Sequence, residues 1–277
     1  MAPKMRDARL TPARPDLAAA HLRGMVAAPR FAEGEKFSVC VGRAALRVRP
    51  DEGAAQDSEL LFGETFTVYD CAQGWAWGQA ANDLYVGYLR QDALTAPFAA
   101  DARVTALMAP VFPAADLKTP VHDFLPLNAG VPVLARQGDY VRIGDEGYLH
   151  RRHLEPPAQT DFAAVAERFL GVPYVWGGKT AAGLDCSGLI QTALQAVGKA
   201  APRDTDMMEK ALGDGVSLEG IKRGDLVFWK GHMGVMLDEA RLLHANAFHM
   251  AVVTEPLAEA MARIEQSAGR VTSIKRL

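Results

Sequence analysis

Cys186 is the residue whose neighbours best suit a nucleophile. It lies in Asp185-Cys186-Ser187-Gly188, after a glycine-rich loop and before a segment with apolar residues at helical spacing. Those apolar residues are Leu189, Ile190, Ala193, Leu194 and Val197. A thiol in the first turn of a helix faces unpaired backbone N–H groups and the positive end of the helix dipole, which favour the thiolate and can stabilise an oxyanion. We therefore expect a lowered pKa at Cys186.

Two histidines downstream offer a base and a group to orient it. His232 opens one apolar strand-like run and His244 lies in the next, with an Asp238-Glu239 turn between them. This pattern predicts a hairpin, although the separation of 12 residues does not by itself place the two side chains together. A cysteine nucleophile needs a general base, and the base needs an orienting partner. The chain thus contains the residue types for nucleophilic catalysis.

The segments around these residues predict an α+β domain. Asp161 is a good helix N-cap, and a helix from there should end at Gly171. The Tyr174 loop and the nucleophile helix come next. The further elements expected are a short helix near residues 206–212, the histidine hairpin, a helix over Glu255–Ile264 and a last strand over Val271–Lys275.

The N-terminal half predicts small β-barrels. Short strand-like runs with turn residues between them fill Lys36–Pro97, and Asp101–Pro156 repeats the scheme after about 60 residues. Each unit has a glycine-aromatic turn, at Gly74-Trp75 and again at Gly138-Asp139-Tyr140. Ahead of them we expect one helix over Pro15–Val26. The predicted domains are a helical N-terminal extension (1–35), two barrels (36–97 and 98–157) and the α+β domain (158–277).

Composition sets limits on the function. The 277 residues are enough for two or three cores, and 30 basic against 33 acidic residues give no overall basic field for nucleic acid or anionic membranes. The three cysteines make no disulfide framework, and we expect Cys40 and Cys71 to be small buried residues. No Cys/His metal-site spacing surrounds Cys186, so neither a metal nor a cofactor is expected. The oligomeric state is left open.

The first 30 residues mix prolines and arginines without an apolar signal-peptide core. No stretch approaches the roughly 18 apolar residues of a membrane span. These features favour a cytoplasmic protein.

The ordered motifs resemble a known enzyme family. Asp-Cys-Ser-Gly-Leu, then Arg-Gly-Asp-Leu-Val-Phe-Trp, Gly-His-Met-Gly-Val-Met-Leu and Leu-His-Ala are similar to the NlpC/P60 family of papain-like cysteine peptidases. The two predicted barrels resemble bacterial SH3 (SH3b) domains. The resemblance implies a multidomain chain in which two all-β SH3b-like barrels precede a papain-like α+β domain. It also implies Cys186 as nucleophile, His232 as base and His244 as the residue that orients His232.

The resemblance also implies substrate-binding residues. Tyr174 matches a tyrosine that lines the family's site, and Asp185 and Ser187 match residues that hold a D-Glu group. Asp185 could equally be the N-cap of the nucleophile helix. In relatives with SH3b domains, a tyrosine and an acidic residue of the first barrel bind a free substrate amine. Tyr85 is favoured here over Tyr88, and the acidic candidates are Asp51, Asp57, Glu59 and Glu64.

The expected activity is hydrolysis of the γ-D-Glu–diamino acid bond in small murein peptides with a free N-terminal L-Ala, in cell-wall peptide recycling. The alternatives are another papain-like amidase or acyltransferase and a non-catalytic protein that binds wall fragments. The diamino acid, meso-diaminopimelate or lysine, and the accepted stem-peptide length are left open.

Overall fold

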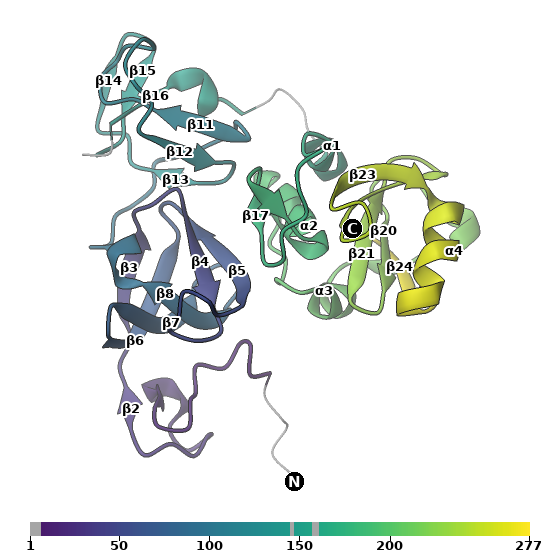
Figure 1. Cartoon of the computed structure of the whole chain (residues 1–277), viewed down its shortest axis with the longest axis horizontal. Coiled ribbons are helices and arrows are strands. Elements are labelled where there is room, and N and C mark those ends of the chain that lie inside the picture. Colours follow the sequence, from purple (N-terminus) through teal and green to yellow (C-terminus); the bar gives the residue numbers. More distant parts are fainter. Residues whose placement is uncertain (1–6, 145–146, 157–160) are drawn as a thin grey trace. The chain divides into compact units, whose positions relative to one another are not determined.

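The computed structural model describes residues 7–144, 147–156 and 161–277. The chain forms two compact units (Figure 1). Unit 1 spans residues 1–104 and 109–154, and unit 2 spans residues 105–108 and 155–277. The predicted boundary between the second barrel and the α+β domain, at residues 157/158, lies outside the described residues.

A seven-stranded antiparallel sheet forms the centre of unit 1. Its strands are β3 (Glu35–Val39), β4 (Arg43–Arg47), β5 (Gln56–Leu61), β6 (Thr65–Ala72), β7 (Trp75–Ala80), β8 (Val86–Arg90) and β9 (Leu94–Thr95), in the order β5-β4-β8-β7-β6-β3-β9. The β6–β7 hairpin turns at Gln73 and Gly74, both with positive φ, as a tight two-residue β-turn requires. Alternate side chains such as Leu46, Phe66 and Leu89 fill the core. A short 3₁₀ helix, η2 (Gln91–Ala93), follows β8.

The second half of unit 1 is built from shorter sheets. It contains β10 (Ala102–Arg103), β11 (Met108–Val111), β12 (Asp123–Pro126), β13 (Gly130–Val131), β14 (Ala135–Gln137), β15 (Tyr140–Arg142), β16 (Tyr148–His150) and η4 (Arg151–His153). Met108 is the last residue of unit 2's short segment. The run β14-β15-β16-η4 has the same order of elements as β6-β7-β8-η2. This parallel favours an internal repeat, and a second SH3b-like barrel stays a prediction.

The predicted N-terminal helix is not formed. The described part of residues 1–35 contains β1 (Ala18–Ala19), η1 (Ala20–Leu22) and β2 (Phe31–Ala32), with β1 and β2 paired in parallel. The N–H groups of Ala18 and Ala19 donate to the carbonyls of Arg30 and Pro12 rather than to a preceding turn. Long-range pairing therefore replaces the helix that the apolar spacing predicted. The burial of Cys71 was also predicted wrongly, because this residue is exposed near the end of β6.

Unit 2 is a six-stranded antiparallel sheet with helices on both faces (Figure 1). The helices are α1 (Phe162–Glu167), α2 (Cys186–Ala196), α3 (Thr205–Ala211) and α4 (Leu257–Ala268), with η5 (Leu218–Gly220). The sheet contains β19 (Asp214–Gly215), β20 (Leu226–Trp229), β21 (His232–Met236), β22 (Arg241–Asn246), β23 (Ala251–Pro256) and β24 (Ser273–Arg276), in the order β19-β24-β20-β21-β22-β23. A separate hairpin joins β17 (Lys179–Thr180) and β18 (Gly183–Leu184).

Successive side chains along the strands of unit 2 point to opposite faces of the sheet, and apolar side chains on both faces form two layers. Val227 and Trp229 belong to the cluster that includes Leu257, Ala260 and Ile264 of α4. The buried helix α2 packs against β21 and β22. Asp161 is the N-cap of α1, as predicted, and its side chain accepts a hydrogen bond from the N–H of Ala164 at 2.6 Å, but the helix ends at Glu167 and not at Gly171. The predicted histidine hairpin is β21–β22, with Val235 opposite Leu243.

One predicted helix begins later than expected. The segment assigned to a helix from Glu255 starts instead as β23, and α4 begins at Leu257. Glu255 is therefore a strand residue opposite Leu242 of β22.

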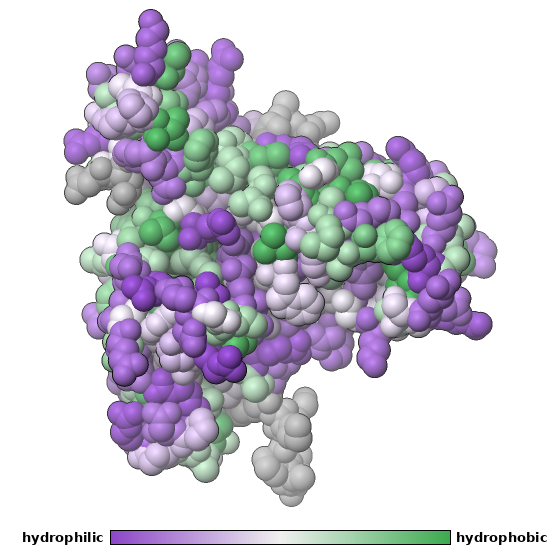
Figure 2. Space-filling view, in the orientation of Figure 1, coloured by the Kyte–Doolittle hydropathy of each residue, from purple (hydrophilic) through white to green (hydrophobic). Residues whose placement is uncertain are grey.

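Hydrophilic residues cover much of the visible surface, with hydrophobic residues scattered among them (Figure 2). The large exposed apolar side chains of unit 2 include Trp176, Phe248 and Met250. None of the helices in the described part of the chain is long and apolar enough to cross a membrane.

Candidate active site

Cys186 is the first residue of α2 and is buried. Its sulfur lies 3.7 Å from Oγ1 of Thr205, and backbone N–H groups of Met233 and Ser187 also hydrogen-bond with it. Burial nevertheless raises the pKa of the thiol to about 11, with a further increase from the charge of Asp185, and these hydrogen bonds lower it less. The lowered pKa predicted from the helix N-terminus is therefore wrong. Loss of hydration raises the pKa more than the hydrogen bonds from Thr205, Met233 and Ser187 lower it.

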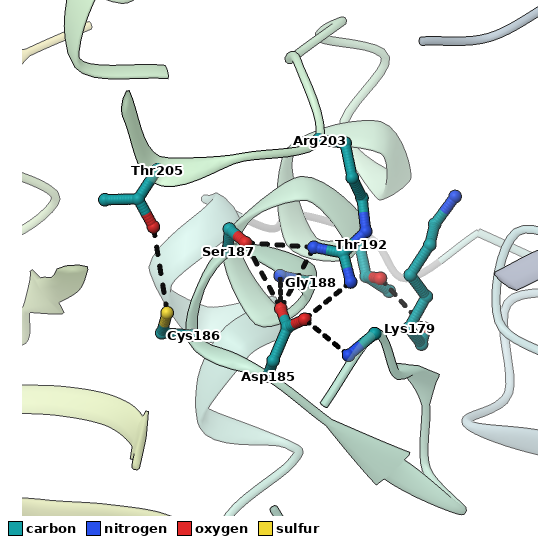
Figure 3. A network of polar contacts seen from close by, with 9 residues as sticks. Lys179, Asp185, Cys186, Ser187, Gly188, Thr192, Arg203 and Thr205 are labelled. Atoms are coloured by element: carbon teal, nitrogen blue, oxygen red, sulfur yellow. Dashed lines mark hydrogen bonds and ion pairs between the residues drawn. The ribbon is translucent and has the colours of Figure 1, made fainter. Parts of the chain in front are cut away.

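Asp185 organises the turn before the nucleophile (Figure 3). Its Oδ1 accepts a hydrogen bond from the N–H of Gly188 at 2.6 Å, which is the N-cap geometry, and its Oδ2 accepts one from Gly177 at 2.8 Å. Arg203 donates to both oxygens, at 3.0 and 2.6 Å, and to Oγ of Ser187 at 2.9 Å. The Ser187 hydroxyl donates to Asp185 at 3.2 Å. The protein itself therefore uses both carboxylate oxygens, and the D-Glu contacts of Asp185 and Ser187 stay predictions.

The two histidines are in direct contact. Nε2 of His232 lies 2.8 Å from Nδ1 of His244. Gly234 allows β22 to approach closely, because a Cβ on Gly234 would lie 2.9 Å from the carbonyl oxygen of Leu243 and 3.0 Å from Cβ of His244. His232 also directly precedes Met233, whose N–H reaches the sulfur of Cys186. The structure thus brings the three predicted catalytic residues to one region of unit 2, and their roles stay predictions.

Burial keeps both imidazoles neutral. It is the main cause that lowers the pKa of each ring to about 3, and the positive charge of Arg263 lowers both further. For His232 the neighbouring His244 contributes as well, while Glu255 acts in the opposite direction. At neutral pH each ring therefore carries a single ring proton, and the hydrogen-bond partners decide which nitrogen holds it.

Two further contacts of His244 were not predicted from the sequence. Its Nε2 lies 2.6 Å from Oε1 of Glu255 and 3.0 Å from Nδ2 of Asn246. Arg263 of α4 pairs with the same Glu255 oxygen. The contact of Glu255 with His244 could not be predicted from the sequence, because a glutamate ahead of an amphipathic segment suggests the first turn of a helix.

The predicted tyrosines lie in different units. Tyr174 is half-buried in the loop before β17, and burial together with Cys186 and Asp185 raises its pKa. Tyr85 is buried in unit 1, directly before β8. Its contact with substrate stays a prediction.

The four acidic candidates in unit 1 differ in their surroundings. Oε1 of Glu59 lies 2.6 Å from Arg43, and Glu64 accepts hydrogen bonds from the N–H of Leu61 and from Asn82. Asp51 is exposed and caps its own turn at Gly53, and Asp57 is half-buried in β5. Among residues 7–144, 147–156 and 161–277, no group of His, Cys, Asp and Glu side chains is placed to hold a metal ion.

Two segments of the chain match known protein families. The NlpC/P60 family matches residues 171–268, and the family described as bacterial dipeptidyl-peptidase Sh3 domain matches residues 46–94. A Bacillus subtilis protein named gamma-D-glutamyl-L-lysine dipeptidyl-peptidase is 30% identical over 47% of this chain and 50% of its own length. A second B. subtilis protein, named gamma-DL-glutamyl hydrolase, is 34% identical over 46% of this chain and 35% of its own. The chain thus spans half or less of the length of these curated relatives.

Solved structures show the same fold. A crystal structure of an NlpC/P60 family protein from Bacillus cereus ATCC 10987 superposes with a TM-score of 0.72 and 19% identity, over 87% of this chain and 99% of that one. An NlpC/P60 endopeptidase from Photobacterium damselae gives a TM-score of 0.59 and 14% identity, over 87% and 71%. This strand-rich chain contains a bacterial SH3 domain and, around Cys186, His232 and His244, a domain of the NlpC/P60 family.

Proposed function

We propose that the chain is a cysteine endopeptidase that hydrolyses the γ-D-Glu–diamino acid bond of small murein peptides with a free N-terminal L-Ala. The observation that carries the proposal is the placement of Cys186 at the start of buried α2, beside Met233 and close to a hydrogen-bonded pair of neutral histidines. The names of the two B. subtilis relatives support a γ-glutamyl bond as the target. A role in cytoplasmic peptide recycling is part of this proposal.

The proposed reaction has two steps, acylation of Cys186 and hydrolysis of the resulting thioester. His232 removes the proton of the Cys186 thiol, and the sulfur attacks the γ-carboxamide carbon. The N–H of Cys186 and the Tyr174 hydroxyl stabilise the oxyanion. The C–N bond then breaks, His232 protonates the leaving amine of the diamino acid, and a thioester remains on Cys186. Water, deprotonated by His232, attacks the thioester carbon, the C–S bond breaks to release the γ-carboxyl group of the D-Glu residue, and His232 returns the proton to the Cys186 thiolate.

Substrate selection forms a separate part of the proposal. Tyr85 of the SH3 domain is the residue proposed to recognise the free amine of L-Ala. A site that requires an unblocked amine must give it a hydrogen-bonding or charged partner and must reject blocked peptides. Tyr85→Phe should then reduce kcat/KM for the free peptide without changing the alkylation rate of Cys186.

The test is mass spectrometry after incubation with L-Ala-γ-D-Glu-L-Lys, with L-Ala-γ-D-Glu-meso-diaminopimelate and with the N-acetylated form of each. Release of free diamino acid from the unblocked peptides alone supports both the peptidase and the amine requirement. Release from blocked peptides as well keeps the peptidase and contradicts the amine requirement. Transfer of the acyl group to an added amine, without hydrolysis, would favour an acyltransferase instead. Binding without any turnover would favour the non-catalytic alternative.

A further inference from the structure

We propose that Glu255, held by Arg263, is a positioning residue that sets the ring protons of both histidines so that Nδ1 of His232 can accept the thiol proton. The inference rests on the proposed function, since it assigns His232 as the base. It is based on three contacts in series. Arg263 pairs with Glu255, Glu255 lies 2.6 Å from His244, and His244 lies 2.8 Å from His232.

The proton positions follow from what each partner can do. A carboxylate paired with a guanidinium only accepts hydrogen bonds, so Nε2 of His244 must carry the proton that faces Glu255. Nδ1 of this neutral ring then has a lone pair, and it accepts from Nε2–H of His232. Because the neutral His232 ring has only one ring proton, its Nδ1 has a lone pair available for the Cys186 thiol.

Asn246 favours the opposite arrangement. Its Oδ1 accepts hydrogen bonds from the backbone N–H of His249 at 2.8 Å, which turns its Nδ2 toward Nε2 of His244. An amide NH₂ is a donor and would leave Nε2 of His244 unprotonated. The proton would then sit on Nδ1 of His244 and be donated to Nε2 of His232. Nδ1 of His232 would carry a proton and could not act as a base. Glu255 therefore has to outcompete Asn246.

The surroundings strengthen Glu255 as a partner. The side chains of His244 and Glu255 are 0% and 12% exposed, and a charged acceptor makes a stronger hydrogen bond than a neutral one in such a site. Arg263 lies on α4 with its guanidinium 4.5 Å from the ring centre of Phe248, which helps to fix the cation beside Glu255. His232 is thus coupled to Arg263 of α4 through His244 and Glu255.

The first part of the test is kinetic. Glu255→Ala removes the carboxylate and leaves Asn246 as the partner of His244, so kcat should fall by about 10²-fold or more, within the range that general acid–base catalysis supplies, with KM nearly unchanged. Glu259→Ala is the matched control, since it removes an exposed carboxylate of α4 and should keep wild-type kinetics. The double variant Glu255→Ala/Asn246→Asp places a carboxylate at Nε2 of His244 again and should regain at least tenfold in kcat.

The second part does not depend on the substrate. Nitrogen-15 NMR of histidine-labelled protein reports which ring nitrogen carries the proton. We expect Nε2–H on both histidines in the wild type, Nδ1–H on both in Glu255→Ala, and Nε2–H again in the double variant. Wild-type protein with Nε2 of His244 unprotonated would overturn the inference, as would unchanged proton positions in Glu255→Ala. If no murein peptide is hydrolysed, the proposed function fails while this NMR result still decides the proton positions.

Discussion

Arg203 and Asp185 form a buried ion pair directly beside the nucleophile. Nη2 of Arg203 lies 2.6 Å from Oδ2 of Asp185, and their side chains are only 0% and 9% exposed. The pair connects the segment before α3 to the start of α2, and Arg203 also holds Ser187. Because Asp185 caps α2 at Gly188, this pair fixes the backbone N–H groups that surround Cys186.

Loss of Arg203 should therefore weaken the nucleophile helix. Arg203→Leu leaves the Asp185 carboxylate buried without its cation, and breaking such a pair typically costs about 3–5 kcal/mol. Amide hydrogen exchange in peptides from α2 should accelerate by more than 100-fold. Arg270→Leu is the control, because the Arg270–Glu265 pair is exposed and exposed pairs contribute about 0–1 kcal/mol. Equal exchange rates in the two variants would contradict the structural role of the buried pair.

Gly188 should tolerate no side chain. A Cβ there would lie 2.1 Å from the carbonyl oxygen of Gly178, so the α2 N-terminus would have to move away from the neighbouring loop. Gly188→Ala should lower peptidase activity by at least tenfold and reduce the thermal stability of unit 2. Gly215→Ala is the comparison, because nothing lies within 4 Å of a Cβ at that position. Wild-type activity in Gly188→Ala would show that the close approach of these two segments is not needed.

Acid should destabilise unit 2 through its histidines. The pKa of His232 and of His244 is about 3 in the folded protein, below the ordinary value of 6.5. The unfolded chain therefore binds protons that the folded chain does not, and stability is lost as the pH falls from 6.5 toward 3. Each ring contributes up to about 1.4 kcal/mol per pH unit in that window.

The change in the free energy of unfolding with pH can be measured by urea unfolding between pH 7 and pH 4, followed by hydrogen exchange in β21 and β22. The double variant His232→Gln/His244→Gln should show a shallower loss of stability over the same range. An identical slope in wild type and double variant would contradict the assignment of these two groups.

The resting thiol should react slowly with alkylating reagents at neutral pH. With a pKa of about 11, the Cys186 thiolate population increases about tenfold per pH unit from pH 7 to pH 10, and the iodoacetamide rate should follow it. Peptide mass spectrometry separates Cys186 from the exposed Cys71. A plateau already reached at pH 6 would instead indicate a thiolate–imidazolium pair in the free protein.

The order of motifs predicted much of unit 2 because each motif is a local signal. Asp161 and Asp185 indicate helix starts because an aspartate side chain can accept a hydrogen bond from the first turn. The apolar strand-like runs around His232 and His244 predict a hairpin. The barrel pattern of residues 36–97 depends on turn residues such as Gly74, and the SH3 family match covers 46–94 within it.

The errors came from interactions that no local pattern contains. The helix expected over Pro15–Val26 is replaced by pairing of β1 with β2, which depends on residues beyond that segment. Glu255 was assigned to a helix because the pairing of β23 with β22 is a tertiary contact. The pKa of Cys186 was predicted from the helix end, and the opposing burial could be seen only once the packing was known.

The most direct test of the central claim is hydrolysis of L-Ala-γ-D-Glu-L-Lys and L-Ala-γ-D-Glu-meso-diaminopimelate by the wild-type protein and by Cys186→Ala, purified in parallel. We predict that the wild type releases L-Ala-D-Glu and the free diamino acid from at least one peptide. Cys186→Ala should release neither while it keeps the wild-type circular dichroism spectrum. Hydrolysis by Cys186→Ala at the wild-type rate, or no hydrolysis by the wild type, would contradict the account.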